Sequence, residues 1–141
     1  MPHRRTQIRN VIVALVETVP GLTVTNNRRY NWQLSELPAA AIYTLNEPAD
    51  TVTIERTQER TLRVAVEIHV VSKGDLDTDV DDWVVLVEKA VNSDYRFSRL
   101  ALGSGLVNTT IGFTGDGDNA HGVCRLEYDV VYRTDPDNPD A

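Results

Sequence analysis

Apolar residues near the start of the chain recur with the spacing of an amphipathic helix. They lie three and four residues apart, which places them on one face of a helix: Ile8, Val11, Ile12, Leu15, Val16 and Val19. Pro20 and Gly21 follow this stripe and end it. The pattern predicts a first helix over residues 4–18.

A second helical pattern follows an acidic segment in the middle of the chain. The acidic residues 75–82 suit the positive end of a helix dipole, and Thr78 or Asp79 is the expected N-cap. We predict a helix from this segment to about Val91. Its buried stripe comprises Val80, Trp83, Val84, Val87, Ala90 and Val91.

Two segments, 61–71 and 123–134, alternate strictly between apolar and polar residues. Successive side chains of a strand point to opposite faces, so each segment predicts a strand with one face on a core and one in water. The residues predicted to face the core are Leu62, Val64, Val66, Ile68 and Val70, and then Cys124, Leu126, Tyr128, Val130 and Tyr132.

Three shorter segments complete the predicted sheet. They cover residues 39–45, 51–55 and 105–114. The glycine- and aspartate-rich residues 115–119 supply the turn of a hairpin that joins the last two strands. Residues 22–36 are polar and irregular and predict a long loop, with a short strand at 22–25 as an alternative.

The order of these elements predicts an α+β fold with the order α-β-β-β-α-β-β. Hairpin connections make the sheet of about five strands mostly antiparallel, with both helices packed on its apolar face. We expect residues 1–134 to form a single domain. The acidic residues 135–141, rich in Pro and Asp, predict a disordered C-terminal tail.

The net charge of −7, from 14 Lys and Arg against 21 Asp and Glu, argues against broad binding to nucleic acid or anionic membranes. Both would be repelled, although DNA that must slide past without sticking is compatible with this charge. No apolar run reaches the roughly 20 residues of a membrane span, and the N-terminus does not read as a signal peptide. Cys124 is the only cysteine and is expected to be a small buried side chain in a cytoplasmic protein.

The acidic segment superficially matches a calcium-binding loop, with Glu88 eleven residues after Asp77. Asp82 replaces the glycine that such a loop needs, so we favour an acidic helix start and keep a weak divalent-cation site at Asp75, Asp77 and Asp79 as the alternative. No zinc-ligand spacing, nucleophile elbow or phosphate-binding loop occurs. We expect no cofactor and no enzymatic activity.

One short segment mixes basic and aromatic residues: Arg28, Arg29, Tyr30 and Trp32. Such residues are enriched at protein interfaces, and in an acidic chain we favour an assembly interface over stacking on nucleotides. Packing of Trp32 on the core is a further alternative. The predicted hairpin tip adds Asp116, Asp118 and Asn119 as candidate interface residues.

Residues 37–43 (LPAAAIY), 62–70 (LRVAVEIHV) and 126–132 (LEYDVVY), with the acidic segment that leads into Trp83, resemble the tail terminator proteins of long-tailed phages, the family of the minor tail protein U. The resemblance covers residues 4–134 in the order of the elements and in the pattern of apolar residues.

This resemblance implies a structural protein, not an enzyme, that forms a hexameric ring on the end of the tail tube, stops tube polymerisation and joins the head. The implied partners are copies of itself, the tail tube protein and a head-completion or connector protein, while DNA passes through the channel without specific binding. The implied location is the virion tail, assembled in the host cytoplasm. Alternatives are another head–tail connector or completion subunit, and a small metal- or ligand-binding domain that uses residues 75–82.

Overall fold

The computed structural model describes residues 2–26, 37–54, 56–72, 74–114, 120–135 and 137–140. Two helices and six strands follow one another along the chain: α1 (Arg4–Glu17), β1 (Thr23–Thr25), β2 (Ala39–Asn46), β3 (Ala49–Thr51), β4 (Gln58–Ser72), α2 (Leu76–Asn92), β5 (Gly103–Thr114) and β6 (Ala120–Thr134). None of the described helices is long and apolar enough to cross a membrane.

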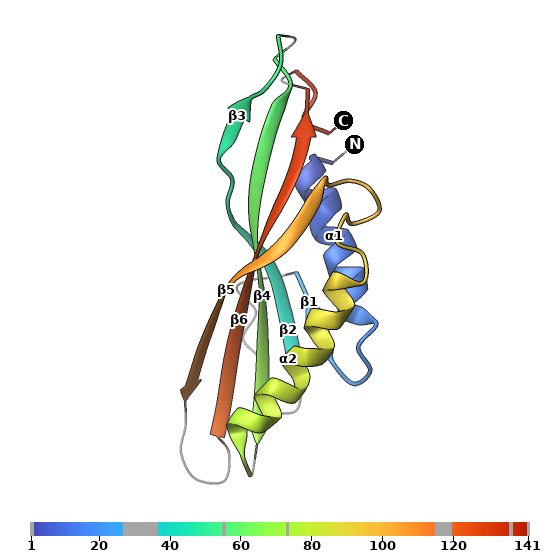
Figure 1. Ribbon diagram of the computed structural model, residues 1–141. Coiled ribbons are helices and arrows are strands. Elements are labelled where there is room, and N and C mark those ends of the chain that lie inside the picture. Colours follow the sequence, from blue (N-terminus) through green and yellow to red (C-terminus); the bar gives the residue numbers. More distant parts are fainter. Residues whose placement is uncertain are drawn as a thin grey trace.

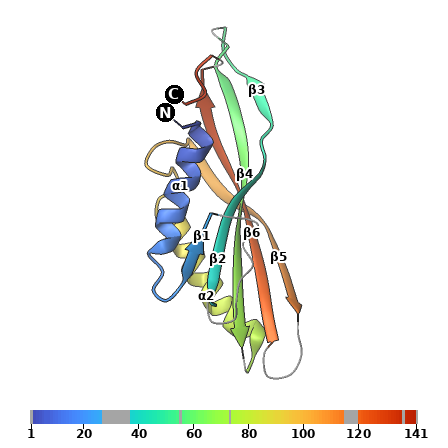
Figure 2. The same ribbon diagram turned by 180° about the vertical axis from the view of Figure 1, so that it is seen from behind.

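The strands form one sheet in the order β1-β2-β4-β6-β5, and β3 pairs with β4. The long central strands β4 and β6 pair residue by residue from Gln58 opposite Thr134 to Ser72 opposite Ala120. All described pairs are antiparallel except that between β1 and β2. Both helices lie on the same side of the sheet, as Figure 1 and Figure 2 show from opposite directions. The predicted α+β architecture is confirmed.

The core lies between the helices and one face of the sheet. The ten alternating side chains predicted to face it, from Leu62 to Val70 and from Cys124 to Tyr132, are at most 2% exposed. Helix α1 packs on β1 and β2, and α2 packs on β4 and β6. At Gly122 of β6 an added Cβ would lie 2.7 Å from Val80 Cγ2, so α2 approaches this strand closely.

Two local predictions are corrected, and the alternative of a short strand at 22–25 is confirmed. The second strand of the sequence-based assignment, at residues 51–55, is instead β3 at Ala49–Thr51. The short strand at 22–25 is present as β1, which gives six strands where about five were predicted. Helix α2 begins at Leu76 with Asp75 as N-cap, not Thr78 or Asp79, because the Asp75 carboxylate accepts the N–H of Thr78.

Part of the C-terminal tail lies beside the first turn of α1, at the end of the molecule where both termini are found (Figure 1). The N–H of Arg4 donates to the carbonyl of Pro139 at 3.0 Å, and the Gln7 side chain donates to the carbonyl of Asp140 at 3.2 Å. The composition of residues 135–141 predicts disorder, whereas these backbone contacts place Pro139 and Asp140 against the domain.

Candidate assembly surface

The predicted interface residues fall on the two longer stretches that the structure does not describe. They lie outside the described residues, so their role stays a prediction: Arg28, Arg29, Tyr30 and Trp32 in the first stretch, and Asp116, Asp118 and Asn119 in the second.

Two acidic residues at the start of α2 accept hydrogen bonds from neighbouring residues of the protein. Asp75 accepts from the backbone N–H of Thr78 at 3.2 Å and from its hydroxyl at 2.8 Å, and these bonds lower the pKa of the Asp75 carboxyl. Asp79 accepts from the hydroxyl of Ser72. Across the described part of the chain, no three His, Cys, Asp or Glu side chains converge as metal ligands. Asp75 therefore has a structural task, as the cap of α2, that needs no cation.

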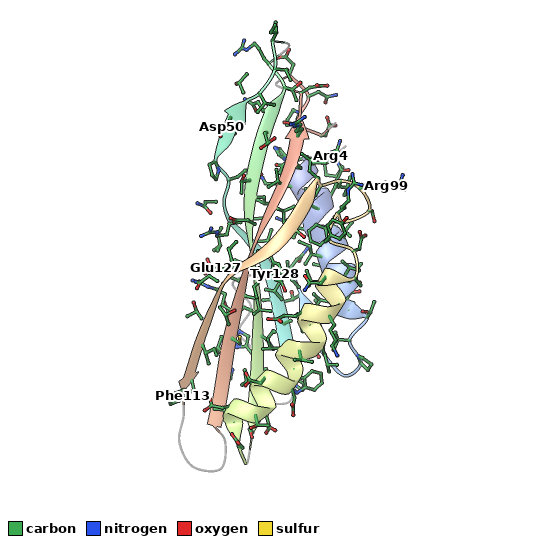
Figure 3. The ribbon with its side chains drawn as sticks, in the orientation of Figure 1. Arg4, Asp50, Arg99, Phe113, Glu127 and Tyr128 are labelled. Atoms are coloured by element: carbon green, nitrogen blue, oxygen red, sulfur yellow. The ribbon has the colours of Figure 1, made fainter. Side chains whose placement is uncertain are left out.

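Strand β5 lies at one end of the described sheet and carries several exposed apolar side chains. Leu106 is 41% exposed, Val107 48%, Ile111 56% and Phe113 72%. Figure 3 shows Phe113 at the C-terminal end of β5. Helix α2 packs on β4 and β6, so it leaves these side chains uncovered. Exposed apolar groups in a row on an edge strand are typical of a surface that another chain covers.

The same strand lies in the longest uncharged stretch of the chain. Residues 100–115 contain no Asp, Glu, Lys or Arg, although a quarter of all residues are charged. Natural edge strands are commonly protected from association by charged residues or Pro. No such residue occurs in β5, so its edge lacks this protection.

The face of the sheet without helices carries a connected polar network. Glu67 of β4 accepts from the hydroxyl of Tyr43 at 2.6 Å, and its other oxygen lies 2.8 Å from Nε2 of His69. The hydrogen bond to His69 is the main cause that lowers the pKa of Glu67. Nδ1 of His69 lies 3.1 Å from Nε2 of His121, on the adjacent strand β6. The network links β2, β4 and β6 across this face.

Further along the same face, Asp129 binds Arg63 through two hydrogen bonds of 2.9 and 3.2 Å. Asn108 of β5 donates to Glu127 of β6 at 2.7 Å. Polar and charged groups of this face thus pair across neighbouring strands, which leaves the face polar with both signs of charge mixed.

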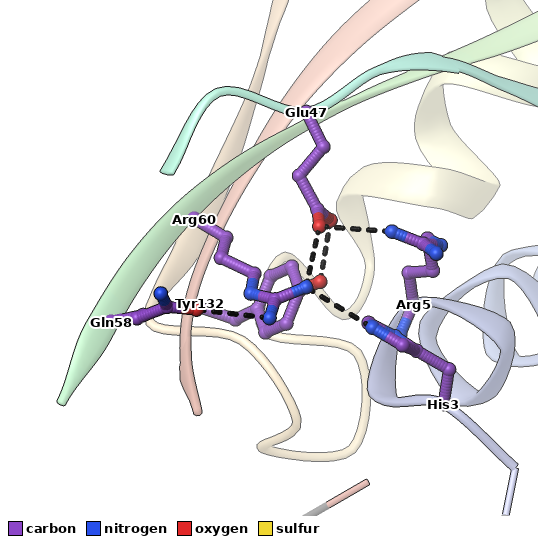
Figure 4. A network of polar contacts seen from close by, with 6 residues as sticks. All are labelled: His3, Arg5, Glu47, Gln58, Arg60 and Tyr132. Atoms are coloured by element: carbon purple, nitrogen blue, oxygen red, sulfur yellow. Dashed lines mark hydrogen bonds and ion pairs between the residues drawn. The ribbon is translucent and has the colours of Figure 1, made fainter. Parts of the chain in front are cut away.

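A second network closes the end of the core near the termini (Figure 4). The Glu47 carboxylate accepts from Arg5 of α1 at 3.1 Å and from Arg60 of β4 at 3.0 Å, and it also accepts the hydroxyl proton of Tyr132 of β6. The Glu47 side chain is 9% exposed and that of Arg60 14%. Burial, and then the cationic Arg5 and Arg60, lower the pKa of the neighbouring His3. These contacts join α1 to the sheet and were not visible in the sequence pattern.

No protein-family profile and no curated protein sequence matches this chain. Among solved structures, a chain from the virion of a native gene transfer agent (GTA) particle is similar, with 11% identity, 94% of this chain and 92% of that chain covered, and a TM-score of 0.44. At that identity and TM-score the similarity carries no functional argument.

Proposed function

We propose that this chain is a structural subunit of a phage tail, and that it assembles with copies of itself into a ring that terminates the tail tube. The observation that supports this most is the uncharged strand β5, with its exposed Leu106, Val107, Ile111 and Phe113. An acidic chain that leaves such a strand open at the edge of its sheet has a surface suited to protein contacts.

Its charges fit a channel for DNA. Each copy carries a net charge of −7, so a ring of copies is strongly acidic. Phosphates of DNA would be repelled by acidic side chains that line the channel, and the DNA would slide without adhering. In this proposal the chain is not an enzyme, and its partners are the tail tube protein and a head-completion or connector protein. The sequence resemblance described above adds the hexameric ring and the head-joining surface.

Electron microscopy of the protein mixed with purified tail tubes tests the proposal. We expect rings on one end of each tube, and tubes of limited length when the protein is present during tube polymerisation. Tubes whose ends stay bare and whose lengths do not change would refute the proposal. Density at the joint with the head, without any effect on tube length, would instead indicate another head–tail connector subunit.

Calorimetry with calcium and magnesium tests the competing small metal-binding domain. Micromolar binding by the isolated chain that is lost on Asp77→Asn substitution would favour that alternative. We expect no such binding.

A further inference from the structure

Strand β5 has one edge that no other described strand covers. It is twelve residues long and pairs with β6 from Gly103 to Thr114, and the strand order of the described sheet ends with it. In an edge strand, roughly half of the backbone N–H and C=O groups point away from the sheet. Most strands are only about five or six residues long. β5 therefore offers a long row of outward-facing backbone donors and acceptors, interrupted by the irregular register between Leu106 and Asn108.

The pairing register shows which side chains a further strand would help to bury. Leu106, Ile111 and Phe113 lie opposite Tyr128, Cys124 and Gly122, on the face of the sheet that carries α2. Their counterparts on β6 are buried beneath the helix, whereas these three are 41%, 56% and 72% exposed. A strand of another chain that pairs with β5 would satisfy its free backbone groups. The chain that supplies this strand would also cover the three exposed side chains and so bury apolar surface.

The distribution of charge favours a second copy of this chain as the occupant. Two copies of a chain with a net charge of −7 repel one another wherever their acidic surfaces meet. The uncharged strand β5 is where a second copy approaches a subunit with the least repulsion. A basic partner would instead bind the acidic residues elsewhere on the surface, and it would gain no electrostatic attraction from the uncharged edge. We infer that β5 pairs along its free edge with a strand of a second copy of this chain, so that the sheet continues from one subunit into the next.

This inference rests on the proposed function in that it specifies how the subunits of the ring contact one another. It names β5 as the contact, which the proposed function does not require. The ring could form through other surfaces, and β5 could pair in an assembly that never binds a tail tube.

Two double variants test the inference. Thr109→Lys with Ile111→Lys places two charges on the exposed edge strand, as natural edge strands do to prevent association. Val85→Lys with Leu86→Lys adds the same charge to α2 at residues that are 49% and 43% exposed and serves as the matched control. Circular dichroism and thermal unfolding are used to check that both variants keep the native fold.

Sedimentation velocity over a wide concentration range, repeated with tail tubes present, measures self-association of the three proteins. Hydrogen exchange then follows the β5 amides, which exchange quickly in an open edge and slowly in a paired one. We expect the wild type and the α2 variant to associate with protection of β5. We expect the β5 variant to associate at least about tenfold more weakly, without that protection.

The inference is overturned if the β5 variant associates as strongly as the wild type, or if the β5 amides stay unprotected both at the highest concentration and on tubes. The proposed function fails in a different way. A wild-type dimer that protects β5, grows no further and leaves tubes uncapped supports the inference and refutes the ring. Rings that cap tubes equally well with the β5 variant support the ring and refute the inference.

Discussion

Removal of the Glu47 carboxylate is expected to lower the free energy of unfolding more than the loss of any surface ion pair. In a Glu47→Ala variant, Arg60 keeps its charge in a site where its side chain is only 14% exposed, and the hydroxyl of Tyr132 loses its acceptor. Loss of one member of a buried ion pair costs about 3–5 kcal/mol, because the other charge stays buried without compensation.

The expected cost lies at the lower end of that range. Arg5, the third partner, is 42% exposed, so water screens its interaction with Glu47 and little is lost there. We expect Glu47→Ala to lower the free energy of unfolding by about 3 kcal/mol. For a domain of this size, about 2–4 °C of melting temperature is lost per kcal/mol, which gives a decrease of about 6–12 °C.

Urea unfolding followed by circular dichroism measures this effect, and an unchanged m-value shows that the unfolded state is not altered. Glu47→Gln, which keeps the shape and one acceptor, should cost only about 1–2 kcal/mol. Glu59→Ala is the matched control. Glu59 pairs with Arg133 at 3.2 Å, and the two side chains are 35% and 51% exposed. This substitution should cost less than about 1 kcal/mol. If Glu47→Ala lowers the free energy of unfolding no more than Glu59→Ala does, the buried contacts of Glu47 do not stabilise the domain as we infer.

Three further predictions follow from the core and the polar face. Gly122→Ala should lower the free energy of unfolding in urea by about 1–3 kcal/mol, because the added Cβ would meet Val80. Gly112→Ala is the control: its Cβ would enter open space and should change stability by less than about 1 kcal/mol. Equal effects of the two substitutions would contradict the close packing of α2 on β6. Burial raises the pKa of the Cys124 thiol to about 11, so a thiol reagent at neutral pH should label it only after unfolding; rapid labelling of the folded protein would disprove its burial. Burial first, and a neighbouring histidine second, lower the pKa of His121 below 6.5. The folded state thus favours neutral His121, so stability should be full above about pH 6.5 and decline as the pH falls below it; His121→Gln should weaken that decline, and an identical pH profile would exclude this cause.

The polar face of the sheet was predicted correctly as a pattern but not as a network. Alternation along residues 61–71 and 123–134 placed Glu67 and His69 on the side away from the core. It could not show that Tyr43 donates to Glu67, or that His121 lies beside His69, because these contacts join residues 24 and 52 positions apart. Such contacts depend on the register between strands.

The sequence alone determined the two helices, the long alternating strands and the side chains that fill the core. These follow from local spacing, since a helix or a half-buried strand reveals its buried face within a few residues. The bounds of β3 and the N-cap of α2 were misplaced because turn and cap residues offer several local choices, and only the packed structure selects one.

Tertiary structure alone decided which strand lies at the edge and which residues close the end of the core. Nothing in residues 103–114 distinguishes an edge strand from a central one, because the position of β5 depends on its pairing with β6 and on where α2 packs. Glu47 likewise gains its role only when α1, β4 and β6 bring Arg5, Arg60 and Tyr132 around it. Local periodicity fixes which face of an element is buried, while the neighbours of that element are set by contacts between distant parts of the chain.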